Sequence, residues 1–274
     1  MLKKLLKYDF RAVLKFWWIA VAMNLLLSVT GGFISLLESY DNWLSDLVST
    51  ISGLPLFLVN CSYVALIIVT LVLLFIRFYQ NLFSDEGYLT FTLPVTRSQL
   101  LNSKFITGIS ILGATVLICF ANLLLMDMIA CWPDVRTGTY FHDTVKYFVT
   151  GSRNQGIYFW LMLAEALVLL VALVVLVVLF LYFCITFGSM IVKKGKLIIS
   201  IILFYGVSSA FVSINLFLVF FGALSLNFVS MDATVNLDPT LSLFLLGLIF
   251  YAGAIAGLLY SLQYWMLDKK LNLP

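Results

Sequence analysis

Long apolar stretches alternate with short polar ones along this chain of 274 residues. A helix that crosses a membrane needs about 20 mainly apolar residues, and six stretches meet that length. They are Phe16–Leu37, Leu54–Ile76, Phe105–Cys131, Ile157–Val192, Leu197–Val229 and Leu241–Leu267. All 5 prolines lie at or beyond the ends of these stretches, where a missing backbone N–H does least harm. The pattern predicts an all-α membrane protein with six transmembrane helices, forming a single domain over residues 1–274.

Two of the six stretches are longer than one crossing requires. As a single helix, Ile157–Val192 would measure about 54 Å, whereas the hydrocarbon core of a bilayer is about 30 Å thick. Leu197–Val229 presents the same problem. These helices either tilt and protrude or they break, and Gly188, Gly206 and Gly222 are the candidate break points. The sequence leaves both alternatives open.

Composition identifies lipid as the surroundings of the chain. Apolar residues make up 63% of it and charged residues 11%, against about 25% charged in soluble domains. With the N-terminus inside, the inner segments hold thirteen of the 16 basic residues: Lys3, Lys4, Lys7, Arg11, Lys15, Arg77, Arg97, Lys104, Lys193, Lys194, Lys196, Lys269 and Lys270. Because basic residues collect on the cytoplasmic side, both termini are predicted to be cytoplasmic.

Residues 1–15 combine a basic face and an apolar face at helical spacing. Lysines and Arg11 fall on one side of the helix, and Leu2, Leu5, Leu6 and Phe10 fall on the other. Such a helix lies in the membrane interface with its basic face towards the lipid headgroups. Asp9 interrupts the apolar face. It either reaches the edge of the helix or faces a protein partner.

The segment 77–105 is the most polar interruption between two spans. Ser84 can cap a short helix with two acids in its first turn, where they suit the helix dipole. Pro94 ends this helix, and Thr96-Arg97-Ser98-Gln99 has the pattern of a capping box that opens the third long helix. Residues 84–93 are therefore predicted to form a short cytoplasmic helix. It is either an ordinary connector or a rigid protrusion that docks on a cytoplasmic partner.

This segment also carries a family signature. The run Asp85-Glu86-Gly87-Tyr88-Leu89-Thr90-Phe91-Thr92-Leu93-Pro94-Val95 is followed by Thr96-Arg97 and by Lys104. It resembles the signature of the permease subunits of ATP-binding-cassette transporters of the type-2 export class, where an E-G…LP-V-S/T-R…K stretch joins the second and third spans. Six spans and an amphipathic N-terminal helix fit the same family.

The resemblance implies how such a chain would work. The short helix would be a coupling helix seated in a cleft of a separate ATPase subunit, docked through Asp85, Glu86, Gly87, Tyr88, Leu89, Phe91, Leu93, Pro94 and Arg97. A second cytoplasmic contact would come from Lys193, Lys194 and Lys196. ATP and magnesium would be held by the ATPase and not by this chain. A second permease copy, identical or not, would complete an exporter of a bacterial plasma membrane, working by alternating access.

No motif in the chain indicates catalysis or nucleic-acid binding. A Gly-rich phosphate-binding loop is absent from the sequence, so an enzyme role in ATP hydrolysis is not expected. His142 has Asp134 and Asp143 nearby in a predicted outer loop, which is more typical of a solvated loop than of a metal site. The scarcity of charges within the spans favours an amphipathic or apolar cargo.

Glu165 is the acidic residue that lies deepest in a predicted span. It follows Ile157 by eight residues, about 12 Å of helix. An acid at that depth is a candidate pathway residue. It could pair with Arg153 or with a facing hydroxyl, or it could lie at the exposed end of an oversized helix. Other polar or small residues in the spans suit helix–helix packing: Asn24, Ser28, Gly31, Asn60, Ser62, Asn122 and Asn215.

Two other classes of protein share this predicted topology. One is a membrane scaffold or sensor whose cytoplasmic segment recruits a soluble partner. The other is a secondary transporter or channel, which the few intramembrane charges and the lack of an evident internal repeat make less favoured. Only the signature at residues 85–97 separates these classes from the permease.

Overall fold

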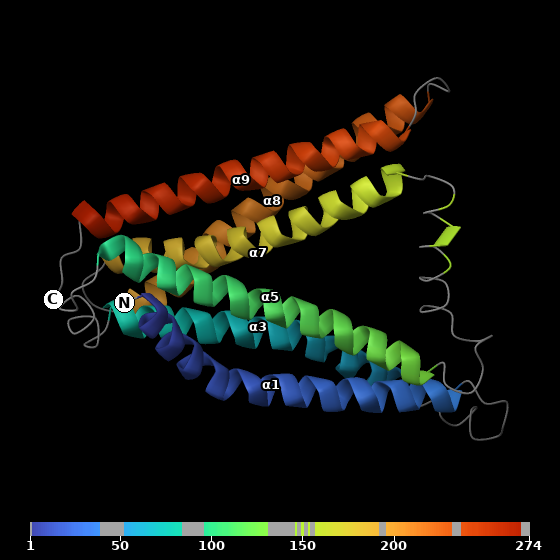
Figure 1. The fold of residues 1–274 in the computed structure, drawn as a ribbon, viewed down its shortest axis with the longest axis horizontal. Helices are drawn as coiled ribbons and strands as arrows, with labels where there is room; N and C mark the ends of the chain where they lie inside the picture. Colours follow the sequence, from blue (N-terminus) through green and yellow to red (C-terminus); the bar gives the residue numbers. More distant parts are fainter. Residues whose placement is uncertain are drawn as a thin grey trace. The chain divides into compact units, whose positions relative to one another are not determined.

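Six long α-helices account for nearly all residues that the structure describes. This computed structural model describes residues 2–38, 52–83, 96–130, 146, 149–150, 153, 157–191, 196–231 and 237–269. The helices are α1 (Leu2–Glu38), α3 (Gly53–Phe83), α5 (Arg97–Ala130), α7 (Ile157–Ile191), α8 (Lys196–Met231) and α9 (Leu237–Lys269) (Figure 1). Each contains a stretch long and apolar enough to cross a membrane. The predicted all-helical fold with six such helices is confirmed.

Helix boundaries extend beyond the predicted spans. The stretch predicted as an interfacial helix and the first span form one continuous helix, α1, which runs from Leu2 to Glu38. Likewise α5 begins at Arg97, eight residues before the predicted span at Phe105. Hydropathy marks the part of a helix that suits lipid, whereas the helix itself begins where its first backbone N–H groups find a cap.

The two overlong stretches do not break. Both α7 and α8 are continuous helices, and Gly188 has a different role from the one proposed for it. A Cβ atom at Gly188 would lie 2.5 Å from Ser200 Oγ and 2.8 Å from Ser200 Cα. The glycine therefore permits close approach of α7 and α8. At Gly206 a Cβ atom would meet nothing within 4 Å, and Gly222 lies within the continuous α8.

The chain divides into two compact units. The three-helix unit comprises Leu6–Leu74 and Ser110–Asn154, and the C-terminal unit comprises Met1–Leu5, Phe75–Ile109 and Gln155–Pro274. The first therefore holds most of α1, the N-terminal part of α3 and the C-terminal part of α5. The second holds α7, α8 and α9 together with the remaining parts of α3 and α5.

Buried hydrogen bonds join the helices of the three-helix unit. The Trp17 indole N–H donates to Thr115 Oγ1 at 2.9 Å, and Thr115 Oγ1 lies 3.2 Å from Thr70 Oγ1. Both threonines also donate to carbonyl oxygens of their own helices. These bonds link α1, α5 and α3 at one level of the unit.

A second level of the three-helix unit is built on asparagine. Asn122 Nδ2 donates to Asn24 Oδ1 at 2.7 Å, and Asn24 Nδ2 donates to Ser62 Oγ at 2.9 Å. One turn further along α1, the hydroxyls of Ser28 and Tyr63 are 2.6 Å apart. The predicted packing role of Asn24, Ser28, Ser62 and Asn122 is confirmed.

Gly31, Asn60 and Asn215, the remaining residues of the predicted packing set, have different contacts. A Cβ atom at Gly31 would lie 3.1 Å from Val59 and 3.2 Å from Met126 Sδ, so Gly31 is a packing position. The side chains of Asn60 and Asn215 instead donate to carbonyl oxygens four residues earlier in their own helices. These bonds lie within one helix, so a packing role for Asn60 and Asn215 stays a prediction.

In the C-terminal unit, α7 packs against both α8 and α9 (Figure 1). Two hydrogen bonds fix how α7 and α9 run. Ser242 of α9 meets Glu165 of α7, and Gln263 of α9 meets Thr186 of α7, with a separation of 77 residues in both pairs. A constant separation means that the two helices are parallel.

The seam between α7 and α9 follows a heptad pattern. The two bonds lie 21 residues apart on each helix, which is three heptads. Along α9, positions that alternate by three and four residues are all buried or half-buried: Ser242, Leu245, Ile249, Ala252, Ala256, Leu259, Gln263 and Met266. This is the spacing of the buried positions in a coiled-coil seam.

Candidate functional site

Most of the predicted ATPase-docking residues lie outside the described residues. This applies to Asp85, Glu86, Gly87, Tyr88, Leu89, Phe91, Leu93, Pro94, Lys193 and Lys194. Arg97 and Lys196 are the first residues of α5 and α8, and the structure describes their backbone only. The described structure therefore bears on this segment through the helices at its two ends.

One predicted feature next to the segment is confirmed. Thr96 Oγ1 accepts a hydrogen bond from the backbone N–H of Gln99 at 3.4 Å, and the Thr96 carbonyl accepts one from Leu100 N–H at 3.1 Å. Thr96 is thus the N-cap of α5. The cap satisfies a backbone N–H of the first turn and fixes the point at which α5 begins.

Tyr182 of α7 anchors both helices that border the segment. Its ring stacks on Phe78 of α3, with centroids 4.0 Å apart and planes 8° apart. The same ring lies 5.6 Å from the ring of Phe105 of α5, and its hydroxyl donates to the Lys104 carbonyl at 3.4 Å. A Cβ atom at Gly108 would lie 2.6 Å from this hydroxyl. The end of α3 and the start of α5 therefore pack on one α7 side chain.

Glu165 is buried, with 8% of its surface exposed, so it does not lie at an exposed helix end. Ser242 Oγ donates to its Oε1 at 2.7 Å, which confirms the predicted pairing with a facing hydroxyl. Among the described residues, the other oxygen, Oε2, is buried and has no hydrogen-bond partner. A buried oxygen in this state is an acceptor for a proton, a cation or a donor group of a ligand.

Gln263 occupies the corresponding position at the other end of the α7–α9 seam. Its side chain is fully buried, and Nε2 donates to Thr186 Oγ1 at 3.2 Å. Thr186 in turn donates to the carbonyl of Tyr182 at 2.8 Å. Within the described part of the chain, Gln263 Oε1 has no partner. Sequence reasoning missed Gln263, although the argument that selected Glu165, a polar residue within an apolar span, applies equally to it.

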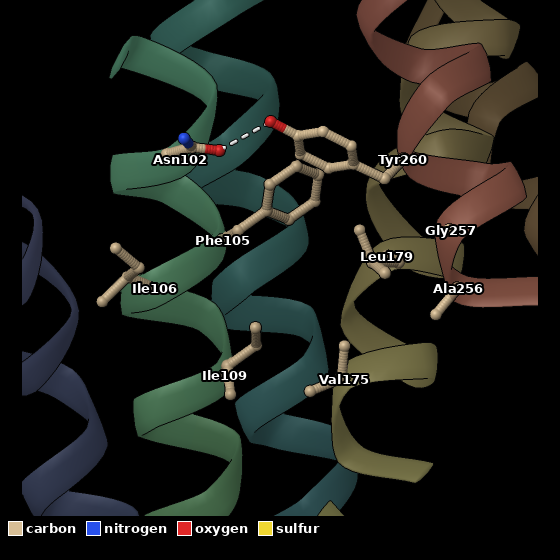
Figure 2. A pocket seen from close by; sticks show the side chains of 9 residues that line it. All are labelled: Asn102, Phe105, Ile106, Ile109, Val175, Leu179, Ala256, Gly257 and Tyr260. Atoms are coloured by element: carbon tan, nitrogen blue, oxygen red, sulfur yellow. Dashed lines mark hydrogen bonds between the residues drawn. The ribbon is translucent and has the colours of Figure 1, made fainter. Parts of the chain in front are cut away.

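A groove lies between the N-terminal part of α5, α7 and α9 (Figure 2). It has a volume of about 410 Å³. At one end Tyr260 donates to Asn102 Oδ1 at 2.9 Å, and the Tyr260 ring lies 5.5 Å from that of Phe105. The remaining lining is apolar: Phe105, Ile106, Ile109, Val175, Leu179, Ala256 and Gly257. Asn102 was not identified from the sequence because it precedes the predicted span, which begins at Phe105.

Two other predicted sites have different outcomes. Asp9 lies on α1 with a half-buried side chain, and its role towards a partner stays a prediction. His142 and its neighbouring acids lie outside the described residues. Across the ranges that the structure does describe, no group of three or more His, Cys, Asp or Glu side chains could hold a metal ion.

Comparison with known proteins identifies no relative: no family model matches the chain, and searches of curated proteins and of solved structures find no match.

Proposed function

We propose that this chain is the membrane-spanning permease subunit of an ATP-driven exporter of the type-2 ATP-binding-cassette class. The observation that carries the proposal is the signature from Asp85 to Arg97, placed between two helices that can cross a membrane. In this proposal both termini face the cytoplasm of a bacterial plasma membrane and residues 1–15 lie at its surface. ATP and magnesium belong to a separate ATPase, and a second permease copy completes the pore.

The anchoring of the segment supports this function. A coupling helix must pass a displacement from the ATPase to the spans, and this requires firm attachment at both of its ends. Thr96 caps the helix that follows the segment, and Tyr182 packs against Phe78 before it and Phe105 after it. ATP binding would move the segment and, through Tyr182, act on α3, α5 and α7 together.

Glu165 is the proposed pathway residue. Its second oxygen is buried between α7 and α9 without a partner among the described residues. An acid within a span is energetically costly, which makes it a functional candidate by default. With so few charges in the spans, the proposed cargo is an amphipathic or apolar molecule that presents a donor group to this oxygen. The adjacent Ser242 holds the carboxyl group in position.

Replacement of the coupling segment tests the proposal. The tagged chain is purified from native membranes, and associated proteins with a Gly-rich phosphate-binding loop are quantified by mass spectrometry together with ATP hydrolysis. Scrambling residues 85–94 should abolish both signals, because the docking surface is lost. Scrambling residues 134–143, on the predicted outer side, is the matched control and should preserve both signals.

The scaffold alternative gives a different result. A scaffold or sensor would lose a partner on scrambling of residues 85–94, but that partner would not be an ATPase. Retention of the ATPase by the scrambled variant would refute the docking role, and purification without any ATPase would refute the exporter.

A further inference from the structure

The groove beside Asn102 has a graded polarity. Figure 2 shows Asn102 and Tyr260 at one end and Ile109 and Val175 at the other. Asn102 is the sixth residue of α5, and Ile109 lies seven residues further along, about 10 Å deeper. One end of the groove can therefore form hydrogen bonds, and the part that extends along the helix can only make apolar contacts.

The polar end retains a free donor. Asn102 Oδ1 accepts the Tyr260 hydroxyl. Asn102 Nδ2 forms no hydrogen bond within the described structure, and the side chain is exposed. An amide N–H in this position suits a neutral acceptor such as the carbonyl oxygen of an ester.

The medium around the groove determines which ligand can occupy its apolar part. The groove is built from α5, α7 and α9, each of which contains a candidate membrane span. In a bilayer the medium next to the groove is hydrocarbon. An acyl chain that moves from the bilayer into the groove therefore gains no hydrophobic free energy, and it binds through close packing and hydrogen bonding. A volume of about 410 Å³ lies in the range of small-ligand sites. A diacyl lipid has the required sequence of groups, an ester carbonyl followed by an apolar chain.

We infer that this groove is a binding site for one acyl chain of a bilayer phospholipid. The chain lies along Phe105, Ile109 and Leu179, and its ester carbonyl accepts a hydrogen bond from Asn102 Nδ2. The lipid comes from the leaflet that meets the N-terminal end of α5. This inference depends on the membrane-spanning helices and not on the proposed exporter, because the measurement below requires no ATPase.

Two glycines of α9 provide a matched pair of variants. Gly257 lines the groove, whereas Gly253, one turn earlier, does not. A Cβ atom at either position would meet no atom within 4 Å. Gly257→Leu therefore places a side chain in the groove at a position with room for its Cβ atom, and Gly253→Leu places the same side chain on the exposed surface of the same helix.

The experiment uses the full chain in phosphatidylcholine nanodiscs that contain a trace of ester phosphatidylcholine with a diazirine on its acyl chain. Labelling of residues 102–109 is divided by labelling of the exposed face of α8 at Ile198 and Ile202, which reports ordinary annular lipid. Gly257→Leu should lower this ratio about tenfold, as expected for the loss of roughly 1.4 kcal/mol of fit. Gly253→Leu should leave the ratio at the value of the unmodified chain.

The polar end is tested with ester and ether host lipids. In an ether-linked phosphatidylcholine disc, the ester probe should outcompete the host and its labelling ratio should rise about fivefold, the typical effect of one neutral hydrogen bond. Asn102→Leu should abolish this rise. Tyr260→Phe breaks the same side-chain hydrogen bond but keeps the Asn102 amide, so the rise should persist.

Three results would overturn the inference. The first is a labelling ratio that Gly257→Leu leaves unchanged. The second is an absence of ester preference in the unmodified chain. The third is conversion of a dimer to a monomer by both glycine variants, which would make the Gly253–Gly257 face of α9 a contact with a second copy of this chain.

Discussion

Polar groups are buried in both units of the molecule, but they are satisfied differently. In the three-helix unit Asn24 uses both ends of its amide, since it accepts from Asn122 and donates to Ser62. In the C-terminal unit Glu165 and Gln263 each make one bond across the α7–α9 seam, and among the described residues each has one oxygen without a partner. No other buried side-chain oxygen or nitrogen in the described residues lacks a partner.

This contrast separates a structural network from candidate functional groups. A satisfied polar network holds its helices in a single arrangement, because any shift would leave groups unpaired within an apolar medium. An unpaired acceptor already carries that cost and becomes satisfied when a donor arrives. The three-helix unit therefore has the features of a scaffold, and the C-terminal unit has the features of a site.

The largest effect on stability is expected at the close contact between α7 and α8 in the C-terminal unit. In Gly188→Leu, the new side chain would meet the backbone of Ser200, which cannot move aside. We expect a loss of about 3 kcal/mol in the free energy of unfolding, the upper range for an overpacked core. Unfolding in mixed detergent micelles, followed by tryptophan fluorescence, measures the loss. Gly206→Leu, which enters open space, is the control and should be tolerated.

In the three-helix unit, Asn24→Leu should cost about 2 kcal/mol. It removes two interhelical bonds and leaves the Asn122 amide without its acceptor, and such bonds are worth roughly 1 kcal/mol each in membrane proteins. Asn60→Leu removes only a bond within α3 at an exposed position. The same unfolding measurement should separate the two variants, and equal losses would mean that the network does not hold the helices.

Gln263→Leu should change stability by no more than about 1 kcal/mol, in either direction. Thr186 would still donate to the Tyr182 carbonyl, and the unpaired Gln263 oxygen would be removed. Replacement of an incompletely satisfied polar group by an apolar one of similar shape is close to neutral. Thermal unfolding is compared with that of Asn24→Leu. A loss as large as that of Asn24→Leu would remove the distinction between the two units.

Glu165→Gln should have the smallest effect on stability, because the side chain keeps its size and its hydrogen bond to Ser242. The amide oxygen can still accept the Ser242 hydroxyl. Abundance in the membrane should be unchanged, while transport by the proposed complex with an ATPase should fall because an amide nitrogen replaces the unpaired carboxyl oxygen. Unaltered transport would show that Glu165 is not a pathway residue.

Much of the fold followed from hydropathy, and the errors have identifiable causes. Glycine is common both at helix breaks and at close helix contacts, so the sequence left Gly188 as a candidate break point, whereas the structure places it at a close contact. Asn102 was missed because hydropathy placed the start of the span at Phe105. The cap at Thr96, also visible in the sequence, marked the true start of the helix.

The candidate site was predictable only in part. The depth of Glu165 within an apolar stretch identified it, and a facing hydroxyl was among its expected partners. Ser242 itself could not be named, because the pairing depends on the parallel register of α7 and α9, which arises from packing between distant segments. The docking role of residues 84–93 stays a prediction.

The register of α7 and α9 also has a mechanical consequence. Hydrogen bonds tie the two helices at points 21 residues apart, a length of about 32 Å. Two helices that are bonded at two such distant points share one register along that length. Tyr182 contacts Lys104 and Thr186, and Thr186 contacts Gln263. The start of α5 is therefore linked through Tyr182 and Thr186 to one end of the α7–α9 pair, and Glu165 lies at the other end.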